Sequence, residues 1–328
     1  MPGSHAESGN DASNQVLQRL RDSIRGIERR STSALAPDLG GASAPGNKTA
    51  ASAWTLGEPN LDALIGSAGL EFGLELGLES GGVHEIKPVD PQSGDLAKNL
   101  AGDLTTADWL AVSAATRRFA LALGIRWLAS CDPLRRQAPV LWCASAGDAA
   151  ELGSPYGPGL VTLGIDPRRL IVVEPARASQ ALWAIEEGLK ANALALVIGQ
   201  LPSIGLTPAR RLSLAAAAGR TPCLLLTHPR SPAVAATATR WRIAPAPSAP
   251  NPLDPEAPGA ARFLVTLERC RGRPLVSRSQ VFRRSGADDS VSVVLEWCDA
   301  AFRFRLASGL AAGAFRSGQS ERGQKRAA

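Results

Sequence analysis

Phosphate binding is the first chemistry that the residue spacing suggests. Gly41, Gly46, Lys48 and Thr49 nearly match a phosphate-binding loop within GASAPGNKT. A working loop needs Gly directly followed by Lys and then Ser or Thr, between a strand and a helix, so that backbone N–H groups converge on the phosphates. Asn47 interrupts that spacing, and the flanks are rich in Ala, Ser, Pro and Gly. We interpret the match as chance.

The metal-binding half of a nucleotide site is also missing from the expected place. The apolar run 194–198 is typical of a buried parallel strand, which in a nucleotide-binding sheet commonly ends in a carboxylate. Here Gly199 and Gln200 follow it, and the polar segment 88–108 contains no Gly-Lys pair. Lys87 and Lys98 either approach a phosphate or are ordinary solvated lysines. We therefore predict no catalytic residue, cofactor site or metal site, and no enzyme activity.

The charge balance permits an acidic partner without requiring one. The 328 residues carry 36 Lys and Arg against 30 Asp and Glu, a net charge of +6, with a pI near 9.4. Nucleic acid is one such partner. The candidate contacts to nucleic acid are Arg210, Arg211, Arg240 and Arg242. The alternative is that these arginines form a solvated face.

Cysteine and hydropathy patterns indicate a cytoplasmic protein. The five cysteines are odd in number, include no C-x-x-C pair, and lie partly in apolar runs, which favours buried free thiols in a reducing compartment. Three histidines offer little for a zinc site. No stretch has the length of a membrane span, and residues 1–14 lack a secretion signal.

The elements that would position these residues alternate between strands and helices. Residues 156–201 form one β-α-β unit, with a strand at 170–173, a helix at 179–191 capped by Ser179 and ended by Asn192, and the strand 194–198. Further strands are expected at 83–86, 140–143, 223–227, 237–244, 263–270, 276–282, 291–298 and 302–306, and further helices near 106–128 and 207–218. This order predicts an α/β fold with a mostly parallel sheet and antiparallel C-terminal edge strands.

Composition divides the chain into three regions. Residues 1–53 comprise a disordered start, a separate amphipathic helix at 14–30 with Leu17, Leu20 and Ile24 on its apolar stripe, and a flexible linker. Residues 54–310 form the core domain, and residues 311–328 a basic flexible tail.

Several phrases resemble known sequences. TLGEPNLDALIGSAGLEFG, GGVHEI and the stretch LGIDPRRLIVVEPARASQALWAIEEGLKANALALVI are similar to the core of the RecA recombinase. The phrases VLWCAS, YGPGLVTLGIDPRRLIVVEPA, TRWRIAPAPS, LERCRGRP and EWCDAAFRFRLA resemble the alphaproteobacterial form of ImuA, the RecA-like family of SOS-induced mutagenesis. The resemblance covers about residues 54–310.

The resemblance implies a RecA-like fold and a set of partners. It implies a non-catalytic accessory protein of translesion DNA synthesis that contacts RecA, the Y-family-like protein ImuB and, through ImuB, an error-prone DNA polymerase III α subunit, with DNA contacted indirectly. Arg269 and Arg271 precede Pro274 where RecA has two lysines that reach a neighbour's nucleotide. They match those lysines, or they protect an edge strand. Leu17, Leu20 and Ile24 resemble in position the RecA helix that packs on an adjacent protomer.

Three alternatives stay open at this point. One is a divergent ATPase whose segment 88–108 forms an unusual phosphate site. Another is a DNA-binding RecA paralogue without catalysis, which the pI favours. The last is a cell-division inhibitor of the SulA type, since that family shares a RecA-like outline.

Overall fold

The computed structural model describes residues 54–59, 62, 78–90, 106–254, 256–271, 283–285 and 290–307. The predicted helix at 14–30, with Leu17, Leu20 and Ile24, lies outside the described residues, as do the linker before residue 54, the strand expected at 276–282, the C-terminal tail and Lys98.

Strands and helices alternate through the first two thirds of the described chain, and strands alone complete it. In chain order the elements are β1 Val83–Pro88, α4 Thr106–Ser130, α5 Pro133–Gln137, β2 Val140–Ala144, α6 Ala146–Leu152, α7 Gly157–Thr162, η1 Pro167–Arg169, β3 Leu170–Val173, α8 Ala178–Lys190, β4 Leu196–Leu201, α9 Leu206–Gly219, β5 Cys223–Thr227, β6 Thr239–Ala246, β7 Arg262–Cys270, β8 Arg283–Ser285, β9 Ser290–Cys298 and β10 Arg303–Leu306.

All ten strands belong to one sheet, in the order β10-β9-β7-β6-β1-β5-β4-β2-β3, with β8 paired to β9. The strands from β6 to β3 in this order pair in parallel. The strands β7, β9 and β10 continue the sheet in antiparallel fashion. The predicted parallel sheet with an antiparallel C-terminal edge is therefore confirmed, and the arrangement is consistent with a RecA-like fold.

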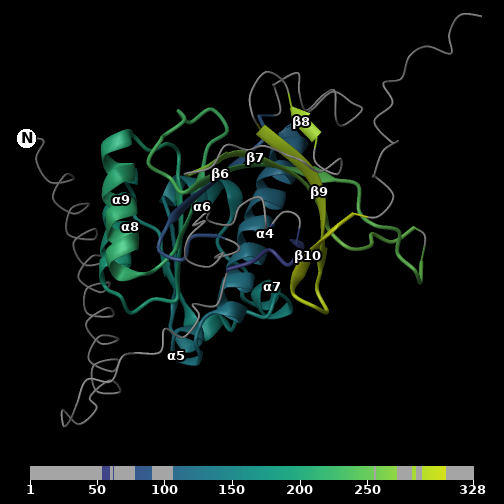
Figure 1. Cartoon of the computed structure of the whole chain (residues 1–328), viewed down its shortest axis with the longest axis horizontal. Coiled ribbons are helices and arrows are strands. Elements are labelled where there is room, and N and C mark those ends of the chain that lie inside the picture. The colour runs from purple at the N-terminus through teal and green to yellow at the C-terminus, as the bar shows by residue number, and fades with distance from the viewer. Residues whose placement is uncertain are drawn as a thin grey trace, which may run out of the picture.

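Helices cover both faces of the sheet. Figure 1 shows α8 and α9 side by side on one face, with α4 on the other and the C-terminal strands curving around it. The α4 face is rich in aromatic side chains, among them Phe119, Trp241 and Phe304, whereas the α8 and α9 face is aliphatic, with Ile185 and Leu212. The strands β1, β2, β4 and β5 contribute side chains to both cores, because successive side chains point to opposite faces.

The boundaries of α8 and β4 in the β-α-β unit differ by one to three residues from the sequence prediction. Arg177, rather than Ser179, is the N-cap of α8, because the Gln180 side chain accepts a hydrogen bond from the Arg177 backbone N–H at 3.2 Å and so starts the helix earlier. Asn192 does follow the helix end, with a left-handed φ of 49°. β4 continues past Ile198 to Leu201, since Gly199 and Gln200 pair with Leu225 and Leu226 of β5.

Among the described residues, the structure contains no helix whose length and apolar character suit a membrane crossing.

Candidate functional site

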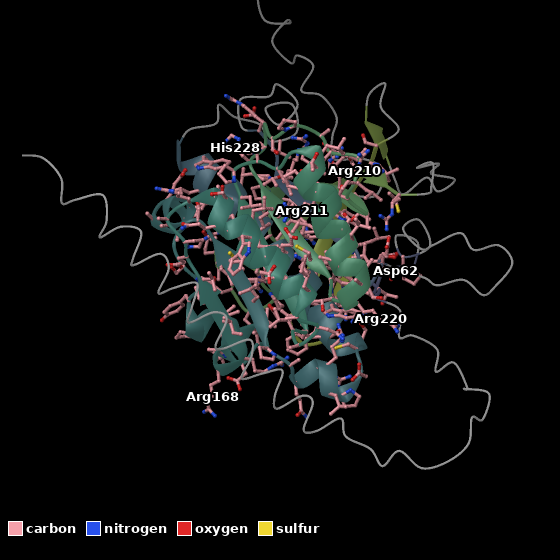
Figure 2. All side chains as sticks on the ribbon, turned by 90° about the vertical axis from the view of Figure 1, so that its left-hand side faces the viewer. Asp62, Arg168, Arg210, Arg211, Arg220 and His228 are labelled. Atoms are coloured by element: carbon pink, nitrogen blue, oxygen red, sulfur yellow. The ribbon has the colours of Figure 1, made fainter. Side chains whose placement is uncertain are left out.

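The carboxyl ends of the parallel strands are the first place to look for a ligand, because open α/β sheets bind ligands there. β1, β5, β4 and β2 all end at this edge. His228, one residue beyond β5, lies near the top of the molecule in Figure 2, and Arg220, before β5, lies toward the bottom. The carboxyl edge is thus the upper end of that view and the amino edge the lower.

Lys87 is buried in a charge network and is not a solvated lysine. Only 2% of its side chain is exposed. Its Nζ donates to the Ser231 carbonyl oxygen at 2.7 Å and lies 3.3 Å from Oε1 of Glu85. Burial lowers the pKa of Lys87, against the opposing effect of the Glu85 charge. The ammonium group of Lys87 is therefore bonded to protein groups.

Glu85 is the centre of that network. Its side chain is fully buried in β1, and Arg240 lies directly opposite it in β6. Arg240 Nε donates to Glu85 Oε2 at 2.9 Å, and Thr227 Oγ1 donates to Glu85 Oε1 at 3.1 Å. Two buried cations thus share one carboxylate, which the side chains of β5 and β6 enclose.

At Gly199, where a metal-dependent ATPase would carry a carboxylate, a side chain would fit only if the Ile185 side chain shifted. A Cβ atom added at Gly199 would lie 2.5 Å from Cδ1 of Ile185 in α8 and 3.4 Å from Cδ1 of Leu225. Both are apolar side chains of the aliphatic core. The position is therefore filled by packing from α8.

Gln200, the next residue of β4, is bonded to a partly buried arginine. Arg117 of α4 donates to Oε1 of Gln200 from Nε at 3.1 Å and from Nη2 at 2.8 Å. Its Nη1 donates to the carbonyl oxygens of Leu152 and Gly153, at 2.6 Å and 2.8 Å. The guanidinium also lies over the Trp142 ring, 5.6 Å from its centroid. A cation at this position repels a divalent metal ion.

Side chains from two helices and two loops meet above this edge. Trp109 donates from Nε1 to Glu151 Oε1 at 2.8 Å and faces the His228 ring, with 5.5 Å between ring centroids. Arg230 pairs with Asp90 at 2.8 Å. These contacts join the start of α4, the end of α6 and the loops after β1 and β5.

Arg269 and Arg271 lie at the opposite, amino edge, at the end of β7. Nη1 of Arg269 donates to the Thr237 carbonyl oxygen at 3.0 Å. Burial lowers the pKa of Arg269, and Arg240 and Arg271 add to the lowering. Arg271 is exposed and pairs with both carboxylate oxygens of Glu79. The structure thus places both arginines on one edge, with Arg271 accessible to a partner.

His84 is buried beside them as a neutral ring. The Glu79 carbonyl oxygen can only accept, so Nε2 of His84, 2.9 Å away, carries the proton. Nδ1 then accepts from Thr239 Oγ1 at 2.9 Å, and that hydroxyl accepts from Trp241 Nε1 at 2.6 Å. Burial lowers the pKa of His84 from 6.5 to about 4.

The fold is therefore expected to lose stability in mild acid. Below pH 6.5 the unfolded chain protonates His84, whereas the folded chain stays neutral until about pH 4. Stability thus falls as pH drops through this window, by about 3 kcal/mol in total. Urea unfolding at several pH values measures it, and a His84→Gln variant should show a pH dependence weaker by that amount. Parallel curves for the two proteins would contradict the prediction.

The other predicted arginines lie in three different environments. Arg210 and Arg211 are both exposed on α9 (Figure 2), and Arg211 Nη2 lies 2.6 Å from Glu186 Oε2. Arg242 pairs with Glu268. Arg240 is 8% exposed and bonded to Glu85, so a DNA phosphate has no access to it in this fold. The structure does not bring the four together.

The cysteines are free thiols, with Cys131, Cys143, Cys223 and Cys270 buried and Cys298 partly buried. Burial raises the pKa of Cys143 to about 12. Within the described ranges, no group of three or more His, Cys, Asp or Glu side chains has a geometry that would hold a metal ion.

Sequence reasoning did not identify Glu85 or Arg117, and it did not predict the bonds that Glu85 forms with Arg240 or that Gln200 forms with Arg117. One signal was present in the printed sequence: VHEIKP places Glu85 and Lys87 two residues apart on one face of an otherwise buried strand. Buried charges need partners, so this spacing predicts a cation or anion on a neighbouring strand.

Comparison with known proteins finds no matching family model. Two curated relatives are both called protein ImuA and come from two strains of Caulobacter vibrioides. Each is 30% identical to this chain over 237 residues, which cover 69% of this chain and 82% of the relative.

Proposed function

The chain belongs to the ImuA family, and on that premise we propose that it is a non-catalytic, RecA-like accessory protein of SOS-induced, error-prone translesion DNA synthesis. It would act in the cytoplasm through contacts with RecA and with ImuB, and through ImuB with an error-prone DNA polymerase III α subunit.

The observation that carries the non-catalytic part is the end of β4. Phosphoryl transfer needs a carboxylate that holds Mg²⁺ and a cation that reaches the β and γ phosphates. At this edge Gly199 is closed by Ile185, Gln200 is bonded to Arg117, and Lys87 is bonded to Ser231 and Glu85. At these three described positions, apolar packing or a bond to another protein group therefore stands where a nucleotide or its metal ion would need a free polar side chain.

The partner contact is assigned to Arg269 and Arg271. They lie at the amino edge of the sheet, opposite the carboxyl edge at which a nucleotide would bind. The amino edge can therefore dock on a neighbouring RecA protomer, while the carboxyl edge, without a nucleotide, does not continue a filament. Guanidinium forks bind phosphate in two-point geometry. For Arg271 to reach a neighbour's nucleotide, its pair with Glu79 must open.

Replacing both arginines by alanine is expected to weaken binding to RecA filaments on single-stranded DNA by about tenfold or more, because each charge-assisted hydrogen bond contributes about 1.5–3 kcal/mol. Biolayer interferometry with immobilised filaments measures this. A matched control, Arg211→Ala with Arg230→Ala, removes two charges that are also ion-paired at the surface.

A second variant tests the direction of the effect. Glu79→Ala frees Arg271 from its ion pair and is expected to leave affinity unchanged or raise it. Equal affinity of the Arg269→Ala, Arg271→Ala protein and the unaltered protein would reject the contact. Turnover of Mg-ATP by the purified protein without RecA would reject the non-catalytic part.

A further inference from the structure

Five arginines from three separate segments lie at the amino edge of the sheet. They are Arg135 and Arg136 in α5, Arg168 and Arg169 in η1, and Arg220, which follows α9. In Figure 2, Arg168 and Arg220 both lie toward the lower end of the molecule, away from His228. The fold gathers them because α5 leads into β2, η1 leads into β3, and Arg220 leads into β5.

Hydrogen bonds connect the three segments into one surface, which we call the amino-edge arginine cluster. Nη1 of Arg135 donates to the Arg220 carbonyl oxygen at 2.6 Å, and Nη2 donates to Asn192 Oδ1 at 3.0 Å. Nη2 of Arg169 donates at 2.7 Å to the carbonyl oxygen of Ala138, the residue that caps α5. Nη2 of Arg136 donates to the Ala129 and Cys131 carbonyl oxygens, at 3.0 Å and 3.3 Å. These bonds fix three of the five side chains, and those of Arg168 and Arg220 are exposed.

Its charge is not neutralised by the acceptors that hold it. Carbonyl and amide oxygens are uncharged, so they order the guanidinium groups of Arg135, Arg136 and Arg169 and leave their positive charge in place. None of the five arginines forms an ion pair with any residue in the described part of the chain. Arginines elsewhere do: Arg118 pairs with Asp299, and Arg262 with Glu296.

Asp132 and Asp166 offset only part of the charge of the cluster. Asp132 caps α5 by accepting from the Arg135 backbone N–H at 2.9 Å, and Asp166 caps η1 by accepting from the Arg168 backbone N–H at 3.0 Å. Their carboxylates are thus directed at backbone amides. Five arginines against two aspartates leave a local excess of positive charge.

We propose that the amino-edge arginine cluster binds the phosphate backbone of single-stranded nucleic acid. β3, β2, β4 and β5 are successive neighbours, so the cluster spans three interstrand spacings, about 14 Å, enough for several consecutive phosphates. Arginine forks suit phosphate oxygens.

An exposed aromatic residue beside the cluster favours nucleic acid over an acidic protein segment. Tyr156 is 73% exposed. The next residue, Gly157, lies against Pro167, which precedes Arg168 in the chain. Sites for single-stranded nucleic acid combine a positive groove with aromatic rings on which bases stack. Tyr156 supplies such a ring.

The test measures fluorescence anisotropy of a labelled oligothymidylate with the full chain and without RecA, so its result is independent of the RecA-binding experiment. Changing Arg136, Arg168 and Arg220 together to Gln is expected to weaken binding at least tenfold. It should also reduce the slope of log K against log salt by about 2, because each lost phosphate contact removes about 0.7. Lysine at the same three positions should retain the slope of log K against log salt. Tyr156→Ala should weaken binding and leave this slope unchanged.

The matched control changes Arg210, Arg211 and Arg230 to Gln, which removes the same charge from exposed positions on α9 and after β5. It is expected to stay within twofold of the unaltered protein. Equal weakening by both triple variants would overturn the proposal, because net charge alone would then explain binding. Absence of binding at low salt would also overturn it. So would stronger competition by an oligoglutamate peptide than by unlabelled oligonucleotide, because that result would identify an acidic protein segment as the partner.

Discussion

Replacing Glu85 by glutamine is expected to destabilise the fold by about 3–5 kcal/mol, the cost of leaving a buried charge without its partner. Glu85 is the only carboxylate in the described structure that lies within ion-pair distance of Lys87 or Arg240. The side chains of both cations are at most 9% exposed. Glutamine keeps the volume and the bond from Thr227 but supplies no negative charge.

Urea unfolding followed by circular dichroism measures this loss at neutral pH. Glu187→Gln serves as the control, because it removes a carboxylate from an exposed pair with Lys190. Surface pairs contribute up to about 1 kcal/mol. A loss below about 1 kcal/mol for Glu85→Gln would show that the two buried cations are compensated by other groups.

Introducing an aspartate at Gly199 is expected to destabilise the protein by about 3 kcal/mol or more and to confer no Mg-ATP hydrolysis. The new Cβ would lie 2.5 Å from Ile185 Cδ1, so α8 or the Ile185 side chain must shift. Overpacking of this kind costs about 1–3 kcal/mol. The carboxylate would in addition be buried among apolar side chains without a hydrogen-bond partner of its own.

Three further variants separate these two costs. Gly199→Ala carries the steric cost alone, so the difference between Ala and Asp at position 199 reports the buried charge. Ile185→Ala creates space, and combined with Gly199→Ala it should cost less than the sum of the single changes. Additive losses in that cycle would show that Ile185 does not obstruct position 199.

Strand and helix positions in the core followed from hydrophobic periodicity, but the partners of buried charges did not. The run at 83–86 predicts β1, and all six residues of this strand are buried, as is typical of a central strand. Arg240, however, is 155 residues from Glu85 in the sequence. Pairing them requires knowing that β6 flanks β1, which depends on the topology of the whole sheet.

The amino-edge arginine cluster shows a different limit of prediction from the sequence. Arg135–Arg136 and Arg168–Arg169 look in the sequence like ordinary surface pairs. Residues that directly precede parallel strands share one edge of the sheet, so the predicted strands at 140–143, 170–173 and 223–227 imply that these arginines and Arg220 share an edge. Their proximity on that edge follows from the strand order β5-β4-β2-β3, which the sequence analysis did not predict. The absence of carboxylate partners among the described residues, in contrast, could be seen only in the structure.

The central position of β1 in the sheet also determines how early the protein can fold during its synthesis. Its two neighbours, β5 and β6, begin at Cys223 and Thr239, more than 130 residues after β1 ends at Pro88. At a synthesis rate of about 5–20 residues per second, β1 waits on the order of ten seconds before either neighbour leaves the ribosome. During that interval the apolar face of β1 and the charges of Glu85 and Lys87 have no native partners, so a nascent chain that stops before Ala246 has no route to the native sheet and is a natural client for chaperones.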